Sequence, residues 1–325
     1  MLSSTHKRYT SFYLFIAVAV IFSTGCNNSD QEISIRELEI SKSFDVLSDS
    51  IFFSLIHDIE FYNNNYYLVD QRTSRVIVTD SSFENTYVLM EKGPGPSDPK
   101  SLYNIDIAND TIYSLEFGSG IKTYDLKGNL LDKIDFPPSV LADFKVSDRG
   151  ILISNPSLDD TPITIVPKEK NGKYIYFGSP EANSLDYDRH ILTHGENIIE
   201  VFKSNRPIIK YYDNNLKMSD KLDLSTLNFF KYTKRHADAN EGLTVVWDAV
   251  ESNDYIYLLM ACRDPSDAMD WSKVLKIKLE DNRMYPESLI QLNKDAYYMT
   301  LEVSNDGKNI LAYNTKLGSL DVYEL

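Results

Sequence analysis

Six polar residues stand at equivalent places in six successive repeats of this sequence, each directly before an apolar segment. In chain order they are Asp58, Asn104, Asp143, His190, Asp248 and Thr300. Carboxylate, amide and hydroxyl oxygens are ligands that Ca²⁺ and other hard cations take, so Asp58, Asp143 and Asp248 are the candidate metal ligands. The alternative is that Asp and Asn favour strand starts and bind water there. We favour this alternative and expect no cofactor; Ca²⁺ is the ion that the first interpretation would require.

The sequence contains little that points to catalysis. It has neither a Gly-x-Ser-x-Gly nor a His-Glu-x-x-His motif. His190 and His194 are four residues apart, a spacing that places two ligands on one face only in a helix. We therefore predict no catalytic residue and favour a binding role. A metal-dependent hydrolase or lyase that uses the six polar residues remains the alternative.

Long segments between the strands carry a second group of candidate binding residues. The segments are 91–100, 178–189, 225–242 and 262–273, and the candidates in them are Phe229, Phe230, Tyr232, Arg235 and Trp271. Aromatic groups together with cations suit a carbohydrate, a peptide or a protein surface. Phe229 and Phe230 could equally well fix a long loop onto the domain.

A repeated pair of apolar runs must position all of these residues. The first run is Tyr66-Tyr67-Leu68-Val69 in the first unit, and a second run, Val76-Ile77-Val78, follows it. Successive units lie about 40 to 58 residues apart, a spacing typical of propeller blades. Alternation, as in Leu275-Lys276-Ile277-Lys278-Leu279, and turns such as Asn305-Asp306-Gly307 indicate strands and hairpins. We expect no amphipathic helix after residue 26.

The repeat predicts an all-β fold, a six-bladed β-propeller of four-stranded antiparallel blades around a channel. If the strands of each blade are A to D from the channel outward, the six polar residues form a ring where strands A begin. The B–C loops and the connections between blades lie on that same face, together with the long segments, so we expect ligands to bind there. The last unit supplies only three strands, and residues 33–40 are expected to form its outer strand and close the ring.

One stretch of the chain resembles a known family. Glu91-Lys92-Gly93-Pro94-Gly95-Pro96 is followed by Ile105-Asp106-Ile107 and by a strand that ends at Asp125-Leu126-Lys127-Gly128. The stretch 91–130 is similar to blades of the six-bladed TolB-like and NHL-like propeller lipoproteins. The resemblance implies the propeller fold and a location at the cell envelope, but it implies no single activity. Gly93-Pro94-Gly95 itself is interpreted as a rigid turn between blades.

The N-terminus indicates export. Lys7 and Arg8 precede an apolar segment, 12–22, that is too short to span a bilayer. Ser23-Thr24-Gly25-Cys26 then resembles a lipobox in which Cys26 is lipidated, although Ser23 stands where Leu is usual. We predict a signal peptide over 1–25, a tether over 26–32 and a single propeller domain over 33–325.

Charge limits the range of partners. The formal net charge is −15, and no basic stripe offsets the repulsion from phosphates, so no nucleic-acid role is expected. We predict an exported monomer that a lipid anchors to the cell envelope, on the periplasmic or the surface side of an outer membrane. Its expected ligand is a protein, a peptide or a carbohydrate.

Overall fold

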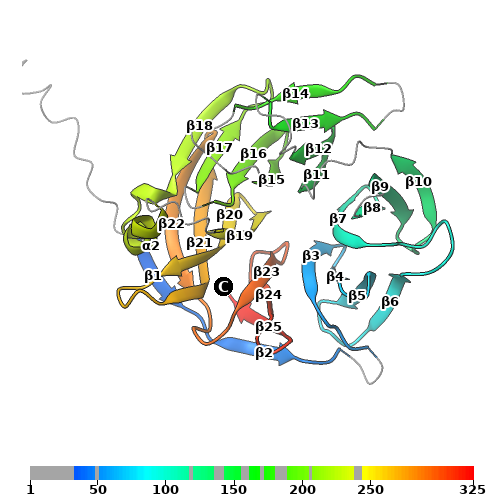
Figure 1. Cartoon of the computed structure of the whole chain (residues 1–325), viewed down its shortest axis with the longest axis horizontal. Helices are drawn as coiled ribbons and strands as arrows, with labels where there is room; N and C mark the ends of the chain where they lie inside the picture. The colour runs from blue at the N-terminus through cyan, green and yellow to red at the C-terminus, as the bar shows by residue number, and fades with distance from the viewer. Residues whose placement is uncertain are drawn as a thin grey trace, which may run out of the picture. The chain divides into compact units, whose positions relative to one another are not determined.

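The computed structural model describes residues 33–47, 51–116, 120–134, 143–154, 161–168, 172–179, 189–204, 207–237 and 244–325. Residues 33–325 form one compact unit, distinct from residues 1–32. The predicted signal peptide, Cys26 and the tether lie outside the described residues. Six sheets surround a central axis (Figure 1), which confirms the six-bladed all-β architecture. Within the described ranges, no helix is long and apolar enough to cross a membrane.

Each blade is an antiparallel meander that runs from the channel outward. Blade one is β3 (Ile56–Tyr62), β4 (Asn65–Asp70), β5 (Arg75–Asp80) and β6 (Thr86–Glu91), and blade two is β7 (Leu102–Ala108), β8 (Thr111–Glu116), β9 (Gly120–Asp125) and β10 (Leu130–Ile134). Blade three is β11 (Phe144–Ser147), β12 (Gly150–Ser154), β13 (Ile163–Val166) and β14 (Ile175–Phe177), and blade four is β15 (Arg189–His194), β16 (Asn197–Phe202), β17 (Ile208–Tyr212) and β18 (Met218–Asp223). Blade five contains β19 (Val246–Ser252), β20 (Tyr255–Arg263), β21 (Met269–Glu280) and β22 (Arg283–Gln291), and blade six contains β23 (Tyr298–Val303), β24 (Asn309–Asn314) and β25 (Ser319–Glu324). The repeated apolar runs are the second and third strands of each blade.

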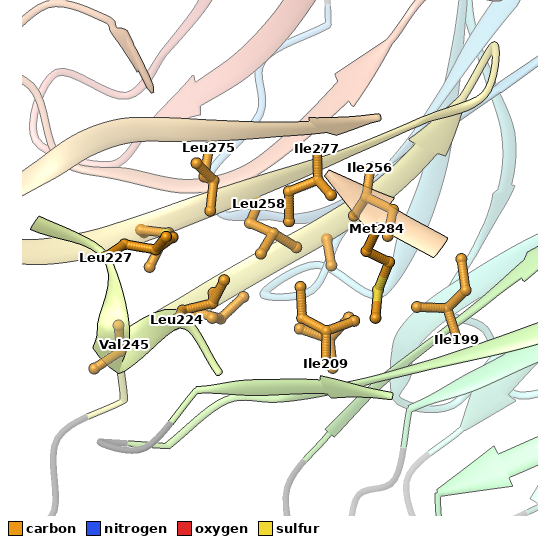
Figure 2. Close-up of a cluster of buried hydrophobic side chains, with 14 of the residues drawn as sticks. Ile199, Ile209, Leu224, Leu227, Val245, Ile256, Leu258, Leu275, Ile277 and Met284 are labelled. Carbon is orange, nitrogen blue, oxygen red and sulfur yellow. The ribbon is translucent and has the colours of Figure 1, made fainter. Parts of the chain in front are cut away.

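The core consists of apolar layers between neighbouring blades. Figure 2 shows the layer between blades four and five, where Ile199 and Ile209 face Ile256 and Leu258. A helical segment completes this layer, with Leu224 buried in it. The segment comprises η1 (Leu224–Thr226), η2 (Asn228–Phe230) and α2 (Lys231–Ala237). The expectation of no helix after residue 26 was therefore wrong, because this insertion gains its stability from the apolar layer that it covers.

The N-terminal strands close the ring, but with different boundaries from those expected. The outer strand of the last blade is β2 (Ile40–Phe44), which pairs antiparallel with β25. The preceding β1 (Ser34–Glu37) pairs in parallel with β22 and gives blade five a fifth strand. The sequence suggested one outer strand over 33–40, but these residues span two strands, and Ile35 in β1 is 66% exposed. The chain instead crosses from blade five to blade six along their outer edges (Figure 1).

Two of the expected loops are more ordered than the sequence suggested. Residues 262–273 belong mostly to β20 and β21, and the turn between these strands is held by Asp264 Oδ1, which accepts hydrogen bonds from Ser266 N (2.8 Å) and Ala268 N (3.0 Å). The Gly-Pro segment forms the turn between blades one and two. Lys100 Nζ donates to Gly93 O and Gly95 O, both at 2.7 Å, which fixes this turn.

Truncation should separate the roles of the two N-terminal strands. Deleting 27–37 removes β1, whose residues are all exposed, and we expect a small fall in melting temperature. Deleting 27–45 also removes β2, the Phe44–Phe83 ring stack (4.5 Å) and one edge of blade six, so the melting temperature should fall several times further. Thermal unfolding followed by circular dichroism measures both. Equal losses for the two truncations would contradict closure by β2.

Candidate functional site

The six ring residues lie together around the channel, at or directly before the starts of the innermost strands. A cavity of about 150 Å³ runs along these strands, and another of about 220 Å³ lies at the mouth on the face of the long loops. Five of the six residues line both cavities: Asp58, Asn104, Asp143, His190 and Asp248. Thr300 joins them through its hydroxyl, which donates to Asp248 Oδ2 (2.6 Å).

Beta-bulges place a second set of side chains at the same mouth. In four blades the strand register shifts by one residue immediately before the ring position. The extra residues, His57, Tyr103, Trp247 and Met299, all line the mouth cavity. Because a bulge re-aims one side chain, two consecutive residues face the channel where simple alternation allows one.

These bulge residues were missed in the sequence, although a signal for them exists. Buried residues on a regular strand recur every second position, but Ile56 and Ile59 are both buried and lie three apart. The same spacing separates Leu102 from Ile105 and Tyr298 from Leu301. An odd spacing of core residues beside a polar ring position therefore indicates a bulge.

The ring carboxylates connect neighbouring blades. In four places a carboxylate accepts a hydrogen bond from a backbone N–H on the innermost strand of the next blade, and we call these the inter-blade carboxylate bonds. The pairs are Ile105 N to Asp58 Oδ2 (2.8 Å), Ile191 N to Asp143 Oδ2 (3.1 Å), Leu301 N to Asp248 Oδ2 (2.8 Å) and Val146 N to Asp106 Oδ2 (2.5 Å). An innermost strand is the edge of its own sheet, so its outward amides need such an acceptor.

The pKa values of two ring carboxylates in equivalent positions are shifted in opposite directions. Burial raises the pKa of Asp58 well above its ordinary value of 3.8, and the neighbouring Glu60 adds to this effect. Burial acts on Asp143 in the same direction, but the hydrogen bond from His190 and the charge of Lys203 hold its pKa below the ordinary value. The Asp143 carboxylate is therefore an anion at neutral pH, with His190 Nδ1 at 3.2 Å from its Oδ2.

A buried ion network lies one layer deeper in the channel. Lys145 Nζ lies 2.8 Å from Asp106 Oδ1 and 3.0 Å from Glu60 Oε1. Burial would lower the pKa of Lys145, but these two carboxylates raise it well above its ordinary value. Burial raises the pKa of Glu60 to about 7, because the attraction of Lys145 only partly offsets the loss of water. Lys145 thus links strand A of blade three to those of blades one and two.

The candidate metal ligands do not converge. Asp58, Asp143 and Asp248 stand in alternate blades, and each is engaged by a backbone amide of the next blade. Among the residues that the structure describes, no three His, Cys, Asp or Glu side chains group closely enough to hold a metal ion. The sequence suggested strand-start preference and water binding for these Asp residues, and it did not predict the hydrogen bonds that they accept from the next blade.

The loop candidates divide between core and mouth. Phe230 is fully buried, and Phe229 packs against the same apolar layer, so both fix the helical segment onto the domain. Tyr232 is half-buried on α2, and the side chain of Arg235 lies outside the described part of the chain. Trp271, which was expected in a loop, lies on β21 with its ring centroid 5.3 Å from that of Trp247 and 4.5 Å from that of Tyr297. Among the candidates whose side chains the structure describes, Trp271 adjoins the channel mouth through its contact with Trp247.

Six antiparallel sheets around a polar channel define the class of this protein, a six-bladed β-propeller. A family model described as 6-bladed beta-propeller, DUF5128, matches residues 46–237, and the chain belongs to this family. The narrower resemblance to TolB-like and NHL-like lipoproteins remains a prediction.

Two solved structures share the fold. A chain from a crystal structure of the mitotic checkpoint complex has a TM-score of 0.55 at 8% identity, over 88% of this chain and 95% of that one. The Pan2 WD40 domain of Neurospora crassa has a TM-score of 0.52 at 9% identity, over 83% of this chain and 89% of that one. At such identities the likeness concerns the fold alone. A search of curated proteins finds no significant match.

The inter-blade carboxylate bonds should be measurable as stability. Asp248→Ala leaves the amide of Leu301 and the hydroxyl of Thr300 without their acceptor, at a cost of about 1–3 kcal/mol in the free energy of unfolding. Asp248→Asn keeps an acceptor oxygen and should lose clearly less. The exposed Asp295→Ala serves as the control, with a change within about 0.5 kcal/mol. Urea unfolding measures all three, and equal losses for the Ala and Asn variants of Asp248 would refute the assignment.

Proposed function

We propose that this propeller is a non-catalytic binding module of the cell envelope that holds its ligand at the loop face, over the channel mouth. The observation that carries the proposal is the cavity of about 220 Å³ at that mouth. Four bulges bring bulky side chains to it, two of them aromatic, and the polar ring forms its floor. Most residues that line this cavity are polar or charged, so the concave site offers convergent hydrogen-bonding groups between aromatic walls, as a ligand site does.

The inter-blade carboxylate bonds favour binding over the hydrolase or lyase alternative. A general base or a metal ligand needs a free lone pair, whereas Asp143 already accepts hydrogen bonds from Asn104, Phe144, His190 and Ile191.

Site-specific photo-crosslinking in the native host tests which face binds. A benzophenone amino acid at Met299, which lines the mouth, or at Leu317, 69% exposed on the β24–β25 turn, should give adducts of higher mass. The matched control positions are Lys127 and Arg283, both exposed at turns of the opposite face. Adducts from the control positions alone, or equally from both faces, would overturn the proposal.

The envelope location rests on the N-terminal sequence. Ser23-Thr24-Gly25-Cys26 is similar to a lipobox, and we propose that Cys26 carries the acyl chains that anchor the protein. The tether of residues 26–32 would then join the anchor to the propeller. The proposal concerns the lipid anchor at Cys26 and names no side of the membrane.

Replacing the lipidated residue tests the anchor. Cys26→Ser removes the acyl acceptor, and each buried CH₂ of a lost chain contributes about 0.8 kcal/mol to membrane binding. We expect the variant in the soluble fraction after high-salt washing, whereas the unmodified protein sediments with membranes. Cys262→Ser is the matched control, because Cys262 is buried in the domain and should leave fractionation unchanged. Sedimentation of Cys26→Ser with membranes would exclude lipid anchoring at this residue.

A further inference from the structure

The mouth cavity contains buried polar atoms that nothing in the described chain satisfies. Asn104 Oδ1, His190 Nε2, His57 Nδ1 and Trp247 Nε1 have no hydrogen-bond partner among the described residues. Asn104 and His190 are only 8% and 7% exposed, and both line the cavity. Buried polar groups without partners are costly, so these atoms indicate an occupant that completes their hydrogen bonds.

The bonds that these side chains already make fix what each free atom can do. Asn104 Nδ2 donates to Asp143 Oδ1 (2.9 Å), which leaves Asn104 Oδ1 as an acceptor. His190 Nδ1 lies 3.2 Å from the anionic Asp143 and donates there, which leaves Nε2 for the cavity, as an acceptor in the neutral ring and as a donor in the protonated one. Indole Nε1 of Trp247 can only donate. The cavity therefore presents acceptors and a donor side by side.

This mixed set selects among ligand chemistries. An ammonium group has donors only and leaves Trp247 Nε1 unpaired. A carboxylate or phosphate has acceptors only, and although Lys203 lines the cavity, the anion would also meet the carboxylates of Asp143 and Asp248 there. A hydroxyl both donates and accepts, so several hydroxyls on one small molecule satisfy Asn104, His190 and Trp247 together. The aromatic walls add a second requirement. Tyr103 belongs to blade two, and its ring centroid lies 4.3 Å from that of His57 with the planes tilted by 44°. Trp247 belongs to blade five, on the opposite side of the ring.

We propose that the channel mouth binds a neutral sugar, with one pyranose ring between Trp247 and Tyr103 and its hydroxyls on Trp247 Nε1, Asn104 Oδ1 and His190 Nε2. The C–H face of a pyranose packs against an aromatic ring while its hydroxyls project to the edges. The sugar can be free or the end of a glycan, since both present the same hydroxyls. This inference rests on the proposed binding function and names its ligand class.

Tryptophan fluorescence provides a direct test, because the chain contains two tryptophans. The full-length protein is titrated with D-glucose, D-galactose, D-mannose and N-acetyl-D-glucosamine. In Trp271→Phe the remaining Trp247 lines the cavity, and at least one of these sugars should shift its emission saturably. Trp247→Phe keeps an aromatic wall but removes the Nε1 donor, and saturation-transfer NMR should show about tenfold weaker binding, as expected for the loss of about 1.4 kcal/mol.

The outcomes separate the ligand class from the binding function. Absence of saturable binding by all four sugars at millimolar concentration overturns the inference, as does an affinity in Trp247→Phe equal to that of the unmodified protein. Saturable binding of methylammonium or of a neutral tripeptide, without sugar binding, also overturns it. In those cases, crosslinks from Met299 and Leu317 would still uphold binding at the loop face. Crosslinks confined to Lys127 and Arg283 would contradict the proposed binding at the loop face as well.

Discussion

The hydrogen bond from a backbone amide of one blade to a carboxylate of the preceding blade is the contact on which the channel depends. Every innermost strand is a sheet edge, and six such edges face one another around the axis. Without acceptors between the blades, their amides would be buried and unpaired. Asp58, Asp106, Asp143 and Asp248 supply those acceptors at four junctions. The ring of blades therefore needs polar residues in its channel to close, whether or not the channel binds a ligand.

The same hydrogen bonds explain why only some of the six ring residues would contact a ligand. Asp143 uses its lone pairs on Ile191, Asn104 and His190, and it thereby orients the last two. The atoms of Asn104 and His190 that do not contact Asp143 face the cavity. They are the side-chain oxygen Oδ1 of Asn104 and the ring nitrogen Nε2 of His190. The carboxylate positions these groups, and the groups it positions are the ones a ligand would meet.

Repetition made most of the fold predictable, whereas the departures from repetition were missed, and only the bulges leave a signal in the sequence, the odd spacing of their core residues. The apolar runs identified the second and third strands of all six blades, and aligning them found the ring from Asp58 to Thr300. Alternation cannot show where His57, Tyr103 and Trp247 point, because their bulges are set by pairing with the second strand. Tertiary pairing likewise extends β20 and β21 through residues expected in a loop, and Phe230 is buried only because an apolar layer lies open beside blade five. The amino-acid sequence alone did not predict these tertiary contacts.

The pairing of β1 with blade five and of β2 with blade six also determines the order in which a pulling force would break contacts. A pull on the chain from its N-terminal side reaches β1 before β2. The four residue pairs between β1 and β22, together with the Glu37–Lys294 ion pair, carry the load first. Their rupture lengthens the chain by the residues of β1 while β2 stays paired with β25. The outer parallel strand thus serves as an extensible element that spares the strand closing the ring.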